Sequence, residues 1–528
     1  MSRFDWLSEF LARLHDENVL VRRGLARALA PAHLLIIDPE DWAKAAAIAA
    51  GFDCRWAALW GDEREARFVL SMVLERSGDY LALRTRVPRE NPVIPSLVPH
   101  FPSADRMERH TRDLLGLIFV NHPDGRRWTR HRAWPEGRFP LRRDFPVGGE
   151  APGRTPADGD YPFHRVLGGG VYEIPVGPVH AGIIEPGHFR FQAVGEEILQ
   201  LEERLGYVHK GIEKIAQGRD PPGLARLAAR ISGDSTVAHT WAACQAMERA
   251  VRCQVPLRAL YLRALMTERE RVANHLGDIG AICNDVGFAF ALYQLSRLRE
   301  QWQRRSGLLF SHRLMMDVVL PGGVAADLDL AGIKALRADH RVLRAELHTL
   351  FNILDDHPSL EDRLLTTGRL FPEAARRLGA LGYVGKASGH GFDVRHDNPY
   401  PPYDDVPVTV PVYEEGDVAA RVRVRMKEVM IALDIMDKLL DALPTDGIRG
   451  NWPTDIRAAE GLGGVEGWRG EILTYVRLDE TGRVARFFPR DPSWLTWPAL
   501  EELILGNIVP DFPVCNKSVN GSYSGHDL

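Results

Sequence analysis

The sequence is short of cysteine and of long apolar runs. Its 528 residues contain five cysteines, and no two of them form a CxxC pair. An odd number of scattered cysteines argues against a disulfide framework. The most apolar early stretch, residues 34–50, is interrupted by Asp38, Glu40 and Lys44, so it cannot span a bilayer. The first residues show no secretory signal pattern, and the cytoplasm is therefore the expected location.

The sequence also has no strong excess of charge of one sign. Lysine and arginine number 66 against 71 aspartate and glutamate, a formal net charge of −5. This balance gives no electrostatic reason to expect a nucleic-acid partner. With 45% hydrophobic and 26% charged residues, the chain has the composition of an ordinary globular protein. Its length predicts more than one domain.

The first part of the chain reads as a small domain. Within residues 1–146, short helical stretches alternate with β-rich runs at 68–74 and 80–87, followed by a helix-like segment at 104–117. This pattern predicts a small α/β sandwich. Residues 147–162 are rich in glycine, proline and aspartate, so we expect a linker there.

The second part, residues 163–528, has a different pattern. Strand-like alternation with Gly/Pro turns at 170–205 is followed by apolar residues at helical spacing over 223–310 and 328–381. A β-like pair at 470–488 precedes a last helix. The expected fold class is α+β, in which the second domain is mainly helical and carries small β-sheets.

Six sequence blocks resemble known families. Residues 108–128 and 140–146 resemble the 30-kDa-type subunit of respiratory complex I. The others resemble the large subunits of group 4 nickel–iron hydrogenases, of the hydrogenase-4 and formate hydrogenlyase type, and the homologous 49-kDa subunit of complex I; they are residues 177–191, 205–214, 268–287 and 466–472. The likeness spans nearly the whole chain and implies a fusion of the two domain types.

The resemblance implies a metal site that this chain does not preserve. In the hydrogenases two CxxC pairs supply four thiolates to nickel and iron, and soft sulfur suits that metal. Here Ser232 and Ser235 stand at the first pair, and Cys515 and Ser518 keep the spacing near the C-terminus. A serine hydroxyl stays protonated at neutral pH and is a weak, hard donor. We therefore expect no nickel–iron centre, no metal and no firmly bound cofactor.

The cavity left behind is the candidate site. Its expected lining is His180, Arg230, Ser232, Asp234, Ser235, His239, Asp511, Cys515 and Ser518. On a helix, Ser235 and His239 would share one face, because they are four residues apart. Cys515 has the alternative of being an ordinary buried or surface thiol.

Three residues carry the expected chemistry. The resemblance makes Glu185 a proton-transfer carboxylate, enclosed by protein, with His188 close by in sequence. It places Arg469 over the former metal site, where a fixed cation stabilises developing charge. The alternatives are structural: Glu185 pairs with an arginine such as Arg190, His180 caps a turn, and Arg469 pairs with Glu466 or Glu471.

Departures from complex I weaken the case for ordinary quinone chemistry. Ile184 aligns with the second histidine of the quinone loop, and Gly233 aligns with the quinone-contacting tyrosine. Lys210 stands where complex I has an arginine near the terminal iron–sulfur cluster, and Ile282 where it has a histidine. A neighbouring cluster would therefore have altered surroundings. A quinone or another acceptor at the cavity stays an open alternative.

Taken together, the sequence predicts the large subunit of the peripheral arm of a membrane-bound, complex I-related oxidoreductase that couples electron transfer to proton or ion translocation. Expected partners are an iron–sulfur small subunit that holds a cluster, a ferredoxin-like subunit and integral membrane ion-translocating subunits. They would hold the chain at the cytoplasmic side of the inner membrane. The alternatives are a non-catalytic scaffold and, disfavoured by the missing cysteines, an active hydrogenase.

Overall fold

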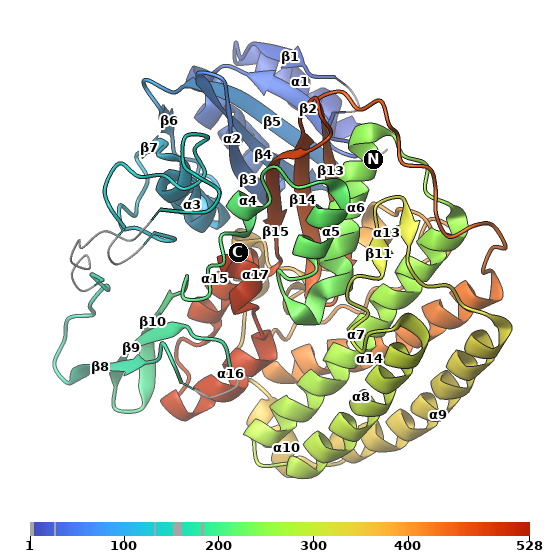
Figure 1. The fold of residues 1–528 in the computed structure, drawn as a ribbon. Coiled ribbons are helices and arrows are strands. Elements are labelled where there is room, and N and C mark those ends of the chain that lie inside the picture. Colours follow the sequence, from blue (N-terminus) through green and yellow to red (C-terminus); the bar gives the residue numbers. More distant parts are fainter. Residues whose placement is uncertain (1–4, 26–27, 131–133, 151–160, 181–183) are drawn as a thin grey trace.

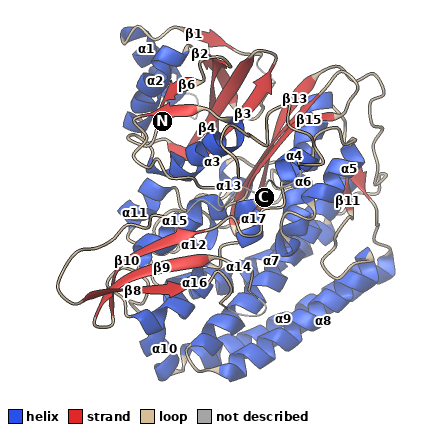
Figure 2. Cartoon of the chain, turned by 60° about the vertical axis from the view of Figure 1, so that its left-hand side comes forward, coloured by secondary structure: helices blue, strands red, loops and turns tan. Residues whose placement is uncertain are grey.

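The computed structural model describes residues 5–25, 28–130, 134–150, 161–180 and 184–528 (Figure 1). An N-terminal sheet domain is followed by a larger, mainly helical part with small sheets, as Figure 2 shows by element type. The predicted α+β class is thus confirmed. Within the described ranges, no helix is both long enough and apolar enough to cross a membrane.

The N-terminal domain is built on five strands in the order β1-β2-β5-β4-β3. They are β1 (Val21–Arg23), β2 (His33–Ile37), β3 (Arg55–Arg64), β4 (Arg67–Arg76) and β5 (Asp79–Pro88). β2 and β5 run parallel and the other neighbours antiparallel. The β-rich runs at 68–74 and 80–87 are therefore strands β4 and β5, because alternating side chains find a core on each face.

Helices cover one face of this sheet. α1 (Asp5–Asp16) and α2 (Trp42–Gly51) bury Trp6, Phe10 and Trp42 in the same core as Leu70 and Leu83 from the strands. A parallel pair, β6 (Val93–Pro95) and β7 (Ile118–Val120), flanks α3 (Asp105–Leu115), the helix expected at 104–117. This helix ends at Gly116, whose positive φ closes the last turn.

The other face of the sheet packs on a C-terminal sheet of three antiparallel strands. These are β13 (Ala459–Gly467), β14 (Gly470–Leu478) and β15 (Val484–Arg490). The Trp60 ring stacks on Tyr475 at 4.8 Å and on Phe488 at 5.8 Å between ring centroids. Aromatic pairs of this kind add about 0.5–1.5 kcal/mol beyond their buried area. The two ends of the chain therefore share one core.

Helices make up most of the second part of the molecule (Figure 1). They are α5 (Pro221–Ala228), α6 (Thr236–Val251), α7 (Leu257–Asp285), α8 (Ala289–Phe310), α9 (Leu330–Asp355) and α14 (Val418–Asp441). The helical spacing at 223–310 thus belongs to four helices. α6 lies on β13 at close range, because a Cβ on Gly461 or Gly463 would come within 2.1 Å of a backbone oxygen of α6. This contact holds the middle of α6 against β13.

The remaining elements are short. A second three-stranded sheet contains β8 (Val171–Val176), β9 (His188–Val194) and β10 (Glu197–Arg204), and β11 (Val319–Leu320) pairs with β12 (Gly323–Val324). The short helices are α4 (Ile212–Ile215), α10 (Pro358–Leu364), α11 (Pro372–Leu378), α12 (Gly382–Lys386), α13 (Val394–Asp397), α15 (Ser493–Leu503), α16 (Phe512–Val519) and α17 (Tyr523–Asp527). Most of the predicted linker, residues 151–160, lies outside the described residues.

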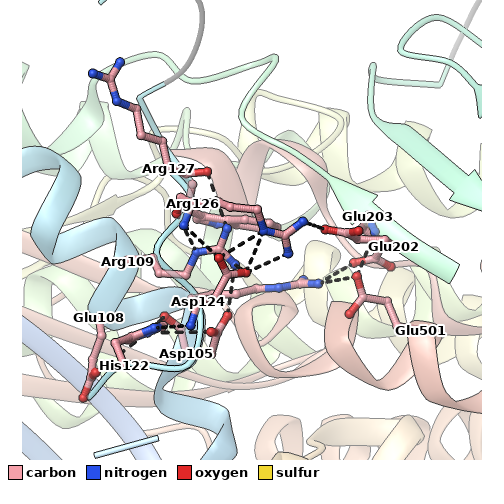
Figure 3. Close-up of polar contacts among 12 residues, drawn as sticks. Asp105, Glu108, Arg109, His122, Asp124, Arg126, Arg127, Glu202, Glu203 and Glu501 are labelled. Carbon is pink, nitrogen blue, oxygen red and sulfur yellow. Dashed lines mark hydrogen bonds and ion pairs between the residues drawn. The ribbon is translucent and has the colours of Figure 1, made fainter. Parts of the chain in front are cut away.

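Charged side chains join the N-terminal domain to the β8–β10 sheet and α15 (Figure 3). The Arg106 guanidinium lies 3.0 Å from a carboxylate oxygen of both Glu203 and Glu501. Arg126 pairs with Glu202 on the same strand. Glu203 is fully buried and Glu501 partly buried, they share one arginine, and desolvation raises the pKa of both carboxyls. This junction holds β10 and α15 against the N-terminal domain.

Candidate functional site

The two predicted serines of the first pair lie between α5 and α6. Ser232 precedes a single 3-10 turn (Gly233–Ser235) and Ser235 ends it, and both side chains are buried. The Ser232 hydroxyl donates to the Asp234 carboxylate and lies 2.9 Å from the Ser522 hydroxyl. The chain thus brings together two positions that are 290 residues apart in sequence.

Ser522 begins a second pair of positions with a two-residue gap, Ser522 and Gly525. The Gly525 backbone N–H donates to the Ser522 hydroxyl at 2.9 Å. A Cβ on Gly525 would lie 2.6 Å from the Asp491 carboxylate, so no larger side chain fits there without movement. We call Ser232, Ser235, Ser522 and Gly525 the serine site. Three hydroxyls and one hydrogen atom occupy its four positions.

Arg469 lies over this site from the turn between β13 and β14. Its guanidinium forms a 2.7 Å ion pair with Asp234 and donates to the backbone oxygen of Asn520. Burial acts to raise the pKa of Asp234, but Arg469 outweighs it and holds that pKa below its ordinary value. The alternative pairing of Arg469 with Glu466 or Glu471 is therefore not what the structure contains.

Trp468 and His239 complete the walls. The Trp468 indole N–H donates to the Ser235 hydroxyl at 3.0 Å and to the Asp234 backbone oxygen at 2.9 Å. The His239 Nε2 atom lies 2.8 Å from Asp491, and both side chains are fully buried. Burial opposes ionisation of Asp491, but the hydrogen bond from His239 outweighs it, and the pKa of Asp491 lies well below its ordinary value.

Glu185 reaches the edge of the site rather than its interior. Its carboxylate accepts a 3.0 Å hydrogen bond from the backbone N–H of Ser524, yet its side chain is exposed. The expectation of an enclosed carboxylate is therefore wrong for this structure, because the loop at 184–186 is only partly covered. The Ser524 hydroxyl lies 3.4 Å from that of Ser522. Glu185 is thus connected to the serine site through the Ser524 residue.

The other two predicted histidines, His188 and His180, lie outside the serine site. His188 is buried on β9, where its Nδ1 atom lies 3.2 Å from the Gly177 backbone oxygen, and burial lowers its pKa. His180 lies 3.2 Å from the Pro178 oxygen, as expected for a residue that caps a turn, and 3.4 Å from the Tyr523 hydroxyl. Arg190 pairs with Glu173, and not with Glu185.

Four predicted lining residues lie in other contacts. Arg230 pairs with Asp317 at the surface, and Asp511 pairs with Arg363. The Ser518 hydroxyl donates to the Cys515 backbone oxygen and accepts from Arg421. Among the hydrogen bonds of the described residues, none joins Cys515 or Ser518 to Ser232 or Ser235. Burial raises the pKa of the Cys515 thiol to about 12, as in an ordinary core cysteine.

The structure does not bring the expected second pair, Cys515 and Ser518, to the first; a later pair that the sequence analysis did not consider, Ser522 and Gly525, lies there instead. Residues 515–518 and 522–525 have the same gap, but only Ser522 meets Ser232. Its position is fixed by the backbone, since Ser522 N–H donates to the Ser493 hydroxyl and its oxygen accepts from Trp497. Asp491 was also missed in the sequence, where an aspartate after a strand carries no distinctive signal.

The donor set does not fit a nickel–iron centre. Hydroxyls are neutral, hard donors, and glycine offers no side-chain donor at all. Each hydroxyl of the serine site already has a partner within the protein. In the part of the chain that the structure describes, no group of three or more His, Cys, Asp or Glu residues is arranged to hold a metal ion.

Comparisons with known proteins agree with this architecture. Family models match for the 30-kDa subunit of respiratory-chain NADH dehydrogenase at residues 35–151, for nickel-dependent hydrogenase at 210–277 and for the 49-kDa subunit at 285–458. Formate hydrogenlyase subunit 5 of Escherichia coli is 34% identical over 87% of this chain and 81% of its own length. One NADH-quinone oxidoreductase subunit from Bacteroides fragilis is 32% identical over 76% of this chain and 79% of its own.

A solved structure shows the same fold. One chain of the membrane-bound sulfane sulfur reductase, an archaeal respiratory membrane complex, matches with a TM-score of 0.65 and 26% identity. The match covers 69% of this chain and the whole of that chain.

Proposed function

Because this chain belongs to the family of complex I-related hydrogenase large subunits, in which a 30-kDa-type and a 49-kDa-type domain are fused, we propose that it is the large subunit of the peripheral arm of a membrane-bound oxidoreductase that works without a nickel–iron centre. Its relatives are subunits of hydrogenases and of complex I-like complexes. The proposal includes membrane ion-translocating subunits, an iron–sulfur small subunit and a ferredoxin-like subunit as partners, at the cytoplasmic side of the inner membrane.

The hydrogen-bonded serine site is the main support for this proposal. The site occupies the position between α5, α6 and the C-terminal helices, and its hydroxyls are hydrogen-bonded to each other and to Asp234 and Trp468. Binding nickel there would need thiolates, which the chain does not supply, and would break these hydrogen bonds. Electron transfer would therefore end at a cluster of a partner subunit or at an acceptor, and not at a bimetallic centre of this chain.

The site retains groups that handle protons. Hydroxyls both donate and accept, and those of Ser524, Ser522 and Ser232 form a row that ends at Asp234. Glu185 meets this row at Ser524, where its carboxylate accepts from the backbone N–H. The proposed role of Glu185 is to exchange protons between solvent and this row of hydroxyls. The role of Arg469 is to hold Asp234 ionised at its inner end.

The test is purification of the complex from its native membrane. The expected result is co-purification of an iron–sulfur subunit and membrane subunits, with iron present and nickel far below one atom per chain. Stoichiometric nickel, or hydrogen evolution from reduced dyes, would overturn the proposal. Glu185→Gln should reduce coupled acceptor reduction without changing the subunits that co-purify; unchanged activity would remove Glu185 from the mechanism.

A second candidate function is a scaffold without redox chemistry of its own. The observation that favours it is the closure of the serine site by its own hydrogen bonds, with Ser232, Ser235 and Ser522 all nearly inaccessible. Replacing Ser232 and Ser522 together by alanine separates the two. A scaffold predicts an assembled complex with full acceptor reduction, whereas a site that takes part predicts assembly with reduced turnover.

A further inference from the structure

A set of buried charges lies behind the serine site, on the other side of Trp468. We call it the charge network; it comprises Glu268, Arg271, His275, Lys386, Asp393, Arg395, Glu428 and Glu466, which are all buried. They come from α7, α12, the start of α13, α14 and β13. Nothing in the sequence pattern marks these charges as chemically active.

Three carboxylates of the network have strong partners. Glu268 accepts from Arg395 at 2.9 Å, from Arg271 at 3.0 Å and from the Tyr403 hydroxyl at 2.7 Å. Asp393 contacts Lys386 and Arg395, each at 2.7 Å. Glu428 lies 2.7 Å from the Lys386 ammonium and 2.6 Å from His275 Nε2. Each of these groups is thereby held in its ionised form.

Glu466 is different. Its Oε2 atom accepts a 3.2 Å hydrogen bond from the Val394 backbone N–H, and its Oε1 atom accepts none from any described residue. The Lys386 ammonium lies 3.6 Å from Oε1 but is already engaged by Asp393 and Glu428. The Glu466 carboxyl is almost fully buried. Of the four carboxylates, Glu466 therefore has the fewest hydrogen bonds and ion pairs to stabilise a negative charge.

The balance of charges in the network also favours an uncharged Glu466. The fixed cations are Lys386, Arg271 and Arg395, whereas burial lowers the pKa of His275 and keeps it neutral. Three cations balance Glu268, Asp393 and Glu428, so an ionised Glu466 would leave one uncompensated negative charge in a dry interior. Its cross-strand partner Glu471 pairs with Arg55 and Arg490 and brings no spare cation to Glu466. Burial, followed by Asp393, raises the pKa of Glu466 to about 8.

Glu466 is also linked to the serine site by the chain itself. It lies at the end of β13, and Trp468 and Arg469 form the turn that leads into β14. Trp468 donates to Ser235 and its ring packs edge-on against His275, with ring centroids 6.0 Å apart. One hairpin end thus holds Arg469 on Asp234 and Glu466 in the charge network.

We propose that Glu466 carries a proton inside the charge network at neutral pH and exchanges it with solvent water when the charge of the serine site changes. The network is then neutral when Glu466 is protonated and carries one negative charge when it is not. The charged groups that face Glu466 are those of α7, α12, α13 and α14 named above, with Arg469 and Glu471 from its own hairpin. The proposal does not depend on whether the chain transfers electrons.

Infrared difference spectroscopy of the purified complex tests whether Glu466 is protonated at neutral pH. Subtracting the spectrum of Glu466→Gln from that of the unchanged protein at pH 7 should leave one C=O band of a protonated carboxylic acid, and this band should be lost above about pH 8. Glu248→Gln is the matched control, because Glu248 is buried but paired with Arg263, and it should remove only carboxylate bands. No acid band in the Glu466→Gln difference overturns the proposal. Glu466→Asp, which keeps the acid, should restore the band at a shifted frequency.

Whether the protonation of Glu466 responds to the serine site is tested by changing the charge at that site. Asp234→Asn removes a negative charge beside Arg469 and should move the pH at which the Glu466 band is lost to lower pH. Ser235→Asp adds a negative charge and should move it to higher pH. Asp234→Glu keeps the charge and should leave it in place. An unchanged midpoint in a folded Asp234→Asn or Ser235→Asp complex overturns the link between the two regions, and either variant suffices for this decision.

Discussion

The serine site and the charge network are two buried polar regions that meet at Trp468, and they are stabilised in different ways. In the serine site neutral hydroxyls share short hydrogen bonds around one ion pair, Asp234 with Arg469. In the charge network each arginine and lysine is committed to two or more carboxylates. Burying a neutral hydroxyl costs little free energy once it has one hydrogen-bond partner. A buried charge that loses its partner destabilises the folded state strongly.

Under the proposed function, this contrast explains how the surrounding architecture can persist without a nickel–iron centre. The four positions of the serine site carry three small hydroxyls and a glycine, which need few partners when buried. The charges that tie α7 to α12, α13 and α14 have no such freedom, because removing one leaves another unpaired. We therefore expect substitutions in the charge network to be costly for stability, and those in the serine site to be mild.

The largest effect is expected from breaking the charge network at Arg395. Arg395→Leu would leave Asp393 and Glu268 with one cation fewer, and loss of one partner of a buried pair costs about 3–5 kcal/mol. Chemical denaturation of the purified protein measures this loss. Arg304→Ala is the control, since Arg304 and Glu300 form an exposed pair one helical turn apart, and no measurable change is expected. Equally small losses of unfolding free energy in Arg395→Leu and Arg304→Ala would contradict the expected dependence on the charge network.

The next effect is a pH dependence that Glu466 imposes on stability. The carboxyl has a pKa of about 8 when folded and an ordinary pKa of 4.5, so the folded state holds the extra proton between these limits. Stability should therefore fall as pH rises from about 4.5 to about 8 and then level off. Glu466→Gln cannot ionise, and its stability curve should be flatter over this window. A curve parallel to that of the unchanged protein would show that Glu466 is ionised throughout.

A smaller effect is expected from filling the fourth position of the serine site. Gly525→Ala places a Cβ 2.6 Å from Asp491, and forced overpacking typically costs about 1–3 kcal/mol. Gly233→Ala is the matched control in the same site, because no atom lies within 4 Å of its added Cβ. Thermal unfolding compares the two. If Gly525→Ala is as stable as Gly233→Ala, the fourth position is open, and a larger side chain fits there.

The sequence was sufficient for the fold and for half of the site. Strands β4, β5 and β14 follow from alternation, and Ser232, Ser235, Asp234 and Arg469 come together as expected. Local pattern carries the strands because their side chains alternate, whereas the site residues were expected from the family resemblance. The family resemblance was needed to connect the segments.

The second half of the site could not be predicted, because it depends on contacts between distant segments. The two-residue gap at 515–518 includes a cysteine and looks like the better match, yet α16 turns that cysteine toward α14, where Arg421 holds Ser518. Only the meeting of Ser522 with Ser232 identifies the later segment. The exposure of Glu185 likewise depends on how the loop at 184–186 meets the rest of the protein.

The smallest expected effect decides between these two segments. Ser232→Ala and Ser522→Ala each remove the hydrogen bond that the two hydroxyls share, worth about 1 kcal/mol. Ser232→Ala also removes the bond to Asp234, and Ser522→Ala removes the bonds to Gly525 and Ser524. Because the two hydroxyls share that bond, the double variant should cost less than the sum, by about 0.5 kcal/mol or more. Cys515→Ala has no contact with Ser232 among these hydrogen bonds, so its cost should add to that of Ser232→Ala. Coupling of Ser232 to Cys515, and not to Ser522, would place the earlier segment at the site.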